Sequence, residues 1–289
     1  MAVAPIKIID PHLHLFDLNL GEYGWLKPQN PPHWQDKQQI ARNYDEQDLI
    51  LAKGMSLAGF VHIEAGFDNR QPWREIDWLE SVCRLPFKSI ACTDLTSTNF
   101  ANNLKKLVQR PSVVGVRHIL DDDALSILTH PHTSKQFSLL NELGFNFEAQ
   151  LSLTNTPAIE ALLSLAQNHK NMAIIINHAG WPPQKATADF AIWKNNLKGL
   201  STCPNVAIKL SAWEMTKRNW LITTATEILE LTLSCFGSNR VMLASNFPLC
   251  TLSHSYSHLW QAYHNDLRIG ADLFTQLSFT NAARWYKFH

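Results

Sequence analysis

Short apolar runs recur along the chain and predict buried strands. The runs are rich in β-branched residues and nearly continuous in apolar positions, which is typical of parallel strands buried on both faces. Eight such runs lie at residues 6–9, 59–65, 89–95, 113–119, 146–151, 172–179, 206–212 and 241–247.

The segments between these runs have the apolar spacing of amphipathic helices, with steps of three and four residues. Strands that alternate with helices predict a parallel α/β fold joined by crossovers. Eight strands in a chain of this length fit a (β/α)8 TIM barrel better than an open doubly wound sheet, and we find no glycine-rich phosphate loop. The expected helices lie at 73–83, 99–108, 134–143, 157–167, 190–200 and 220–235.

Length and charge narrow the class of protein further. The chain has 289 residues, of which 45% are hydrophobic, so we expect a single domain over residues 1–289. Lys plus Arg equals Asp plus Glu at 25 each. This balance gives no electrostatic reason to expect nucleic acid or an anionic membrane as a partner. A small-molecule substrate is the expected partner, and the oligomeric state stays open.

The cysteines and the start of the chain bear on the compartment. Five scattered cysteines without a C-x-x-C pair argue against a disulfide framework, and we interpret them as reduced core residues. Lys7 and Asp10 interrupt the stretch where a signal peptide would be apolar. We therefore expect a cytoplasmic protein.

A long irregular stretch follows the first strand. Residues 19–37 contain three prolines, two glycines and the aromatic residues Tyr23, Trp25 and Trp34. A loop of this length after a barrel strand is expected to be a lid or a pocket wall. The alternative is an ordinary surface excursion packed by its own aromatic side chains.

Polar side chains gather where the predicted strands end. In a TIM barrel the active site lies at the carboxyl ends of the strands, so these positions share one mouth. They are occupied by His12, His14, His62, Glu64, Arg117, Glu148, Gln150, His178, Lys209, Ser211, Trp213 and Asn246.

The motif "HLH" places His12 and His14 on the same side of an extended strand. Together with His178 they would supply three neutral nitrogen ligands, enough for a catalytic zinc with an open position for water. Each residue also has a structural interpretation. His178 could be a hydrogen-bonded core histidine, Glu64 and Arg117 could form a structural ion pair, and Lys209 could extend to the outside. A second pair, His130 and His132, is assigned no role.

These residues lie in stretches that resemble the amidohydrolase 2 family of the amidohydrolase superfamily, in the branch of sugar-lactone hydrolases and pyrone-dicarboxylate lactonase. The resemblance covers residues 6–288. It implies a barrel hydrolase in which His12, His14 and His178 match the family's histidines and Arg117 a substrate-facing arginine. The matching stretches, in family order, are "IIDPHLHLFD", "YGWL", "VVGVRH", "INHAGWP", "NVAIKLSAWE", "RVMLASNFPLC" and "NAARWYKF".

The chain departs from the family at Asn246, where relatives usually have an aspartate that serves as metal ligand, general base or both. An amide cannot take a proton from water, so Asn246 cannot be the base. Glu64 or His178 could activate water instead, or the chemistry could be lost. One divalent metal, zinc or manganese, is possible, and a metal-independent mechanism is the alternative. A binuclear centre is not expected, since the fourth strand ends without a lysine.

The expected function is hydrolysis of a small lactone or a related acyl compound, with His178, Glu64 and Asn246 at the reacting centre. Two alternatives remain open: a metal-dependent decarboxylase of the same superfamily and a non-catalytic binding protein. The residues expected to contact substrate are Arg117, Trp25, Trp181, Trp213, Ser211 and His62.

Overall fold

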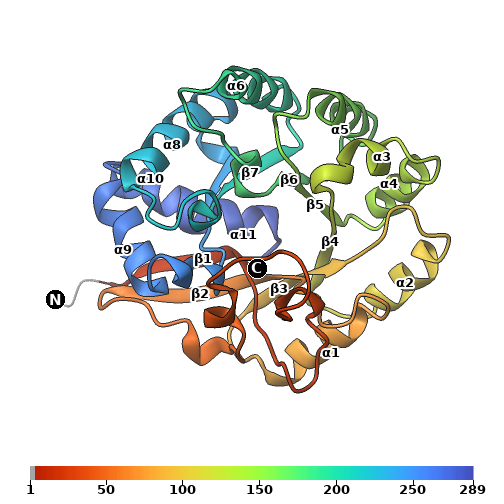
Figure 1. The fold of residues 1–289 in the computed structure, drawn as a ribbon, viewed down its shortest axis with the longest axis horizontal. Helices are drawn as coiled ribbons and strands as arrows, with labels where there is room; N and C mark the ends of the chain where they lie inside the picture. Colours follow the sequence, from red (N-terminus) through yellow and green to blue (C-terminus); the bar gives the residue numbers. More distant parts are fainter. Residues whose placement is uncertain (1–3, 289) are drawn as a thin grey trace.

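Eight parallel strands form one sheet in sequence order, β1 to β8, in the computed structural model, which describes residues 4–288. This is the expected α/β barrel, viewed along its axis in Figure 1. The strands are β1 Ile6–Leu13, β2 Met55–Ile63, β3 Phe87–Cys92, β4 Val113–Ile119, β5 Asn146–Gln150, β6 Ile174–Ile176, β7 Val206–Leu210 and β8 Val241–Leu243.

The barrel closes between β1 and the residues after β8. A parallel bridge joins Leu13 to Phe247, and the His14 amide donates to the Phe247 carbonyl oxygen at 2.7 Å. Asp10 ties the same two segments together, because its Oδ1 accepts from the amides of His12 and Ser245, each at 3.1 Å. Burial raises the pKa of this carboxyl to about 6. The closing seam therefore passes directly beside two of the candidate histidines.

Helices surround the strands, and the six expected helices are present with ends shifted by one or two residues. Five further helices were not predicted, mainly because four or five residues are too few to show a periodicity. The helices are α1 Trp73–Val82, α2 Phe100–Leu107, α3 Ala124–Leu128, α4 Thr133–Glu142, α5 Thr156–Asn168, α6 Ala188–Ser201, α7 Trp213–Thr216, α8 Ile222–Phe236, α9 Tyr256–Asp266, α10 Ala271–Thr275 and α11 Asn281–Trp285.

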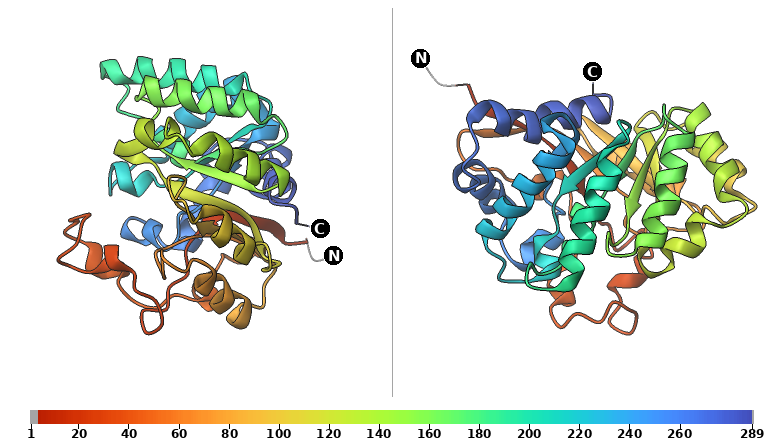
Figure 2. Two further views of the ribbon diagram at one scale, coloured as in Figure 1. Left: turned by 90° about the vertical axis from the view of Figure 1, so that its right-hand side faces the viewer. Right: turned by 90° about the horizontal axis from the view of Figure 1, so that it is seen from above.

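The barrel interior is a packed core rather than a pore. Inward-facing side chains from the strands, among them Val61, Ile175 and Met242, form one apolar cluster with Ala282 and Tyr286 from the C-terminal segment. The segment around α11 therefore closes the barrel at the amino-terminal ends of the strands. Figure 2 shows both chain termini at this end.

The long stretch after β1 projects from the opposite end, as the red to orange segment in Figure 2 shows. Lys37, the last residue of this stretch, is buried. Its ammonium group donates to the carbonyl oxygens of Trp25, Lys27 and Asn30 at 2.9, 2.9 and 2.7 Å. The Trp25 indole donates to the Ala65 carbonyl oxygen at 2.7 Å. These bonds fix the stretch over the end of the barrel where a pocket wall was expected.

All five cysteines lie within the described residues and are free thiols, three of them buried and two half-buried. No helix among residues 4–288 is long and apolar enough to span a bilayer.

Gly115 gives a test of the close packing between β4 and β5. A Cβ atom at this position would lie 2.5 Å from the Asn146 carbonyl oxygen and 2.9 Å from Ile90 Cδ1. We expect Gly115→Ala to lower the free energy of unfolding by about 1–3 kcal/mol, because neighbouring strands cannot yield without losing pairing. Gly270→Ala is the matched control, since nothing lies within 4 Å of its added carbon. Equal urea unfolding midpoints for the two variants would contradict this packing.

Candidate active site

Three imidazoles converge at the carboxyl end of the barrel. The ring of His12 lies 5.1 Å from that of His14 and 4.6 Å from that of His178, measured between centroids. His12 belongs to β1, His14 follows β1 directly, and His178 stands two residues after β6. The chain turns sharply there, since four consecutive residues from His178 to Trp181 have a left-handed φ. Such backbone strain is typical of functional positions.

A hydrogen bond orients each of the three rings. His14 Nδ1 donates to the Ile63 carbonyl oxygen at 2.7 Å, which leaves its Nε2 with a lone pair. His178 Nδ1 pairs with the Ser211 hydroxyl at 2.9 Å. Ser211, expected to contact substrate, therefore positions His178.

His12 differs from the other two histidines because its neighbour is a cation. The Lys209 ammonium group lies 3.4 Å from His12 Nδ1 and can only donate there. The neutral His12 ring must then have its proton on Nε2. This Nε2 is buried and has no hydrogen-bond partner among the described residues. The site therefore contains a buried N–H donor without a protein acceptor among the described residues.

All three imidazoles are neutral at physiological pH. Burial is the main cause that lowers the pKa of His12, His14 and His178 well below 6.5. The positive charge of Arg117 lowers all three further, and that of Lys209 lowers the pKa of His12 and His178. A neutral imidazole can accept a proton at one nitrogen and donate from the other.

Lys209 lies inside the barrel and does not extend to the outside. Its Nζ donates to Glu148 at 2.8 Å, and both side chains are fully buried. Glu148 also accepts hydrogen bonds from Tyr286 and Asn177. Burial lowers the pKa of Lys209 to about 8 against the opposing effect of Glu148. The sequence indicated Glu148 and Lys209 as strand-end residues, but only the fold shows that they meet.

Glu64 and Arg117 form a buried ion pair. Arg117 Nε and Nη2 lie 2.8 and 2.7 Å from Glu64 Oε1, and Nη1 donates to Gln150 at 3.0 Å. Burial raises the pKa of Glu64 although Arg117 opposes the shift. The pair limits Glu64 as a general base, because its carboxylate already holds a cation. Arg117 keeps its charge beside the histidines.

Asn246 contacts a carboxylate that sequence reasoning missed. Its Nδ2 donates to Glu214 Oε1 at 2.6 Å, and both side chains are buried. Burial raises the pKa of Glu214 to about 7. Glu214 also lines a cavity of about 390 Å³ between α7 and residues 34–36 of the long stretch. It stands in the stretch "NVAIKLSAWE", one residue after the strand-end residue Trp213, but no feature of the sequence links it to Asn246.

The remaining predicted substrate contacts differ in their placement. The prediction for His62 needs correction, because its Nε2 contacts Glu75 at 3.0 Å and its Nδ1 accepts from the Leu15 amide at 3.2 Å. Both nitrogens are used within the fold.

The three tryptophans also separate. Trp181 lies beside His178, with 4.7 Å between ring centroids. Trp25 belongs to the long stretch, 6.2 Å from Trp34 by the same measure. Trp213 is buried, its ring lies tilted against that of Trp220 with 6.0 Å between centroids, and it donates its indole N–H to the Tyr263 hydroxyl at 2.7 Å. Its contacts are those of a packing residue rather than a pocket wall.

The donor set fits a metal ion poorly. Among residues 4–288, no group of three or more His, Cys, Asp or Glu side chains is arranged to hold one. His12 presents an N–H rather than a lone pair, Asn246 contributes no charge, and Lys209 and Arg117 place positive charge beside the rings. Zinc requires deprotonated nitrogen ligands. The predicted ligands His12, His14 and His178 thus lie together, but the tautomer that Lys209 imposes on His12 is unsuited to a metal ligand.

A parallel eight-stranded barrel with titratable side chains at its carboxyl end is the arrangement in which TIM-barrel enzymes hold their active sites. The chain belongs to the amidohydrolase family, whose family model matches residues 9–288.

Relatives extend over nearly the whole chain. An uncharacterised protein of Sinorhizobium fredii is 30% identical and covers 99% of this chain and all of its own. The L-fucono-1,5-lactonase of Burkholderia ambifaria is 23% identical, over 96% of this chain and 95% of its own. A crystal structure of a Burkholderia multivorans amidohydrolase with bound zinc has a TM-score of 0.81 at 19% identity, and covers 97% of this chain and 99% of its own. The last similarity confirms the fold.

The poor fit of the three histidines to a metal ion can be tested by measuring the metal content of the protein. We expect protein purified without added metal to contain zinc and manganese far below one equivalent per chain, because Lys209 holds His12 in the wrong tautomer for a ligand. We also expect added zinc not to raise the unfolding temperature, since a ligand that binds only the folded state would stabilise it. Elemental analysis and thermal scans measure the two quantities. Stoichiometric zinc that a chelator removes together with stability would contradict this expectation.

Proposed function

We propose that the protein hydrolyses a small lactone of a sugar acid or a dicarboxylic acid by attack of water on the ring carbonyl, without a metal. The observation that supports this most is the unpaired, buried Nε2 of His12 beside two further neutral imidazoles. A buried donor without a protein partner costs free energy, and a substrate oxygen would satisfy it.

His178 is the proposed general base. With its Nδ1 proton donated to Ser211, the free Nε2 removes a proton from water as the water oxygen bonds to the carbonyl carbon. The lowered pKa keeps His178 unprotonated at neutral pH, so the lone pair on its Nε2 is available to accept a proton. Glu64 is less suited because Arg117 already occupies its carboxylate.

The negative charge that forms on the carbonyl oxygen needs a fixed donor. His12 Nε2–H supplies it, and the neighbouring Lys209 ammonium stabilises the charge further. One such donor contributes about 3 kcal/mol in comparable sites. The ring C–O bond then breaks, and the proton held by His178 passes to the leaving oxygen. The products are a carboxylic acid and an alcohol, and the imidazole returns to its neutral form.

Arg117 and Trp181 would bind the rest of the substrate. Glu64 engages Nε and Nη2 of Arg117 and Gln150 engages Nη1, so the second N–H of Nη1 remains for a carboxylate or hydroxyl group. Trp181 offers an aromatic surface for a sugar-like ring beside the base. The activity named for the relative from Burkholderia ambifaria supports a lactone as substrate.

The products separate this function from its alternatives. Lactone hydrolysis consumes one equivalent of base per turnover, which a pH-stat records for a panel of sugar-acid and dicarboxylate lactones. Release of carbon dioxide from an aromatic acid would instead indicate a decarboxylase. Binding of these compounds without turnover would indicate a binding protein.

We expect His178→Ala to reduce lactone turnover by about 10²- to 10⁴-fold, the usual contribution of a general base. Cooperative unfolding should persist, because the ring lies at the mouth rather than in the barrel core. His132→Ala is the matched control, since His132 lies outside the site. Steady-state kinetics with both variants decides the point, and near wild-type turnover by His178→Ala would remove His178 from the mechanism.

Position 246 gives a prediction about pH. The pKa of Glu214 is about 7 in the folded protein and 4.5 in the unfolded chain. The folded state therefore binds the proton more tightly, and the free energy of unfolding falls by about 3 kcal/mol as the pH rises from 4.5 to 7. Asn246→Asp places a second carboxyl beside it, and the two would share a proton. We expect the free energy of unfolding of this variant to fall by a further 1–3 kcal/mol, approximately, as the pH rises from about 5 to about 8. We expect no gain in activity.

The double variant Asn246→Asp with Glu214→Gln supplies the control. It restores one carboxyl and one amide, so the additional pH dependence should disappear. Urea unfolding at several pH values measures the effect. Equal slopes for the single and the double variant would show that the two side chains do not interact.

A further inference from the structure

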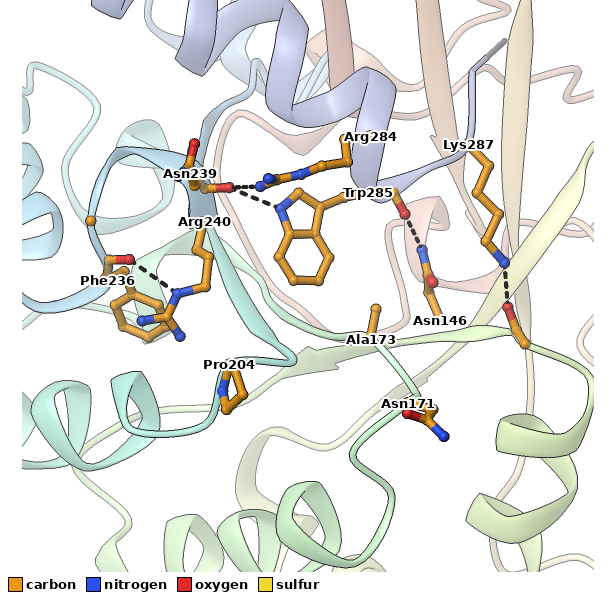
Figure 3. A pocket seen from close by; sticks show the side chains of 12 residues that line it. Asn146, Asn171, Ala173, Pro204, Phe236, Asn239, Arg240, Arg284, Trp285 and Lys287 are labelled. Atoms are coloured by element: carbon orange, nitrogen blue, oxygen red, sulfur yellow. Dashed lines mark hydrogen bonds between the residues drawn. The ribbon is translucent and has the colours of Figure 1, made fainter.

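A second cavity opens at the end of the barrel opposite the histidines. Its volume is about 640 Å³, and Figure 3 shows it from close by. The residues around it precede β5, β6, β7 and β8 or belong to the C-terminal segment at α11. Its lining comprises Gly144, Asn146, Asn171, Ala173, Pro204, Phe236, Gly237, Asn239, Arg240, Arg284, Trp285 and Lys287.

The charges of this cavity are all positive. Arg240, Arg284 and Lys287 line it, and no carboxylate belongs to the lining. None of the three cations forms an ion pair with a carboxylate within residues 4–288. Backbone carbonyl oxygens hold them in place: Lys287 Nζ donates to Gly144 at 2.7 Å, and Arg284 donates to Asn239. A carbonyl oxygen orients a cation without neutralising it.

Arg240 is the most firmly held of the three cations. Its guanidinium donates to the carbonyl oxygens of Phe236, Cys203, Val206 and Ser201 at 2.8–3.2 Å. Burial lowers the pKa of Arg240. An anion in the cavity would lie against this fixed charge.

An indole ring forms one wall. Trp285 is half-buried, and its N–H donates to the Asn239 carbonyl oxygen at 3.1 Å. Asn146 donates to the Trp285 carbonyl oxygen at 2.9 Å, which fixes the backbone of the same residue. Figure 3 shows the ring between Arg284 and Arg240, with Asn146 and Lys287 to its side. A flat ring could therefore stack on the indole while its anionic group meets the cations.

We propose that this cavity is a second binding site, for a small planar organic anion such as an aromatic carboxylate. The cations supply charge-assisted hydrogen bonds to the carboxylate, which are about twice as strong as neutral ones. Trp285 contributes the aromatic contact. The site is independent of the histidines, since the two lie at opposite ends of the barrel.

Benzoate and its neutral isostere benzamide are suitable probes for isothermal titration calorimetry with the intact protein. We expect benzoate to bind and benzamide to bind at least about tenfold more weakly, because loss of one charged hydrogen bond costs about 1.5–3 kcal/mol. Arg284→Gln and Lys287→Gln should each weaken benzoate binding by a similar factor. Lys287→Arg keeps the positive charge and should retain benzoate binding. Lys194→Gln on α6 is a control for the loss of a surface charge.

Arg117→Gln distinguishes this cavity from the barrel mouth, which also contains positive charge. Benzoate binding that survives Arg117→Gln and falls in the Arg284 and Lys287 variants would support the second site. Binding lost only in Arg117→Gln would place benzoate at the mouth and overturn the proposal. Equal affinity for benzoate and benzamide would overturn it as well. None of these outcomes depends on lactone hydrolysis.

Discussion

The candidate site depends on a lysine and a glutamate buried together inside the barrel. Lys209 and Glu148 are fully buried and 2.8 Å apart, and Tyr286 and Asn177 occupy further positions on the carboxylate. Removal of two charges from water costs several kcal/mol for each ion, and their attraction offsets this only with good geometry and additional hydrogen bonds. An apolar pair of similar volume could stabilise the barrel as well. The ion pair is thus better explained by its effect on His12.

That effect is a choice of tautomer. Because Lys209 donates to Nδ1, His12 points an N–H into the mouth, whereas His14 and His178 have their Nδ1 atoms bonded to Ile63 and Ser211. In the proposed mechanism, these chemically alike imidazoles therefore have different roles, His12 as donor and His178 as base. Lys209 and Arg117 both lie beside the imidazoles as the cations of buried ion pairs, with Glu148 and Glu64 as their partners. Asn246 adds no negative charge to this mouth.

The sequence predicted the architecture well because strands buried on both faces leave a direct apolar signal. The eight strands and the helices α1, α2, α4, α5, α6 and α8 arise where the pattern indicated them, whereas α9, with 11 residues, was missed. The other missed helices, among them α7 and α11, have only four or five residues and are too short for a periodic signal, so tertiary contacts rather than local propensity hold them. The predicted convergence of His12, His14 and His178 followed from barrel geometry, which brings all strand ends to one mouth.

Roles within the mouth were harder to predict, because they depend on which atom each neighbour contacts. His62 was expected to face substrate, but Glu75 and the Leu15 amide occupy its nitrogens. Glu214 was overlooked since nothing in the sequence links it to Asn246, 32 residues away. By itself, the sequence determined the barrel and the residue types at its mouth through hydrophobic pattern and chain order. Only the tertiary structure decided protonation, tautomer and pairing, because these depend on distances of a few ångströms between residues far apart in the chain.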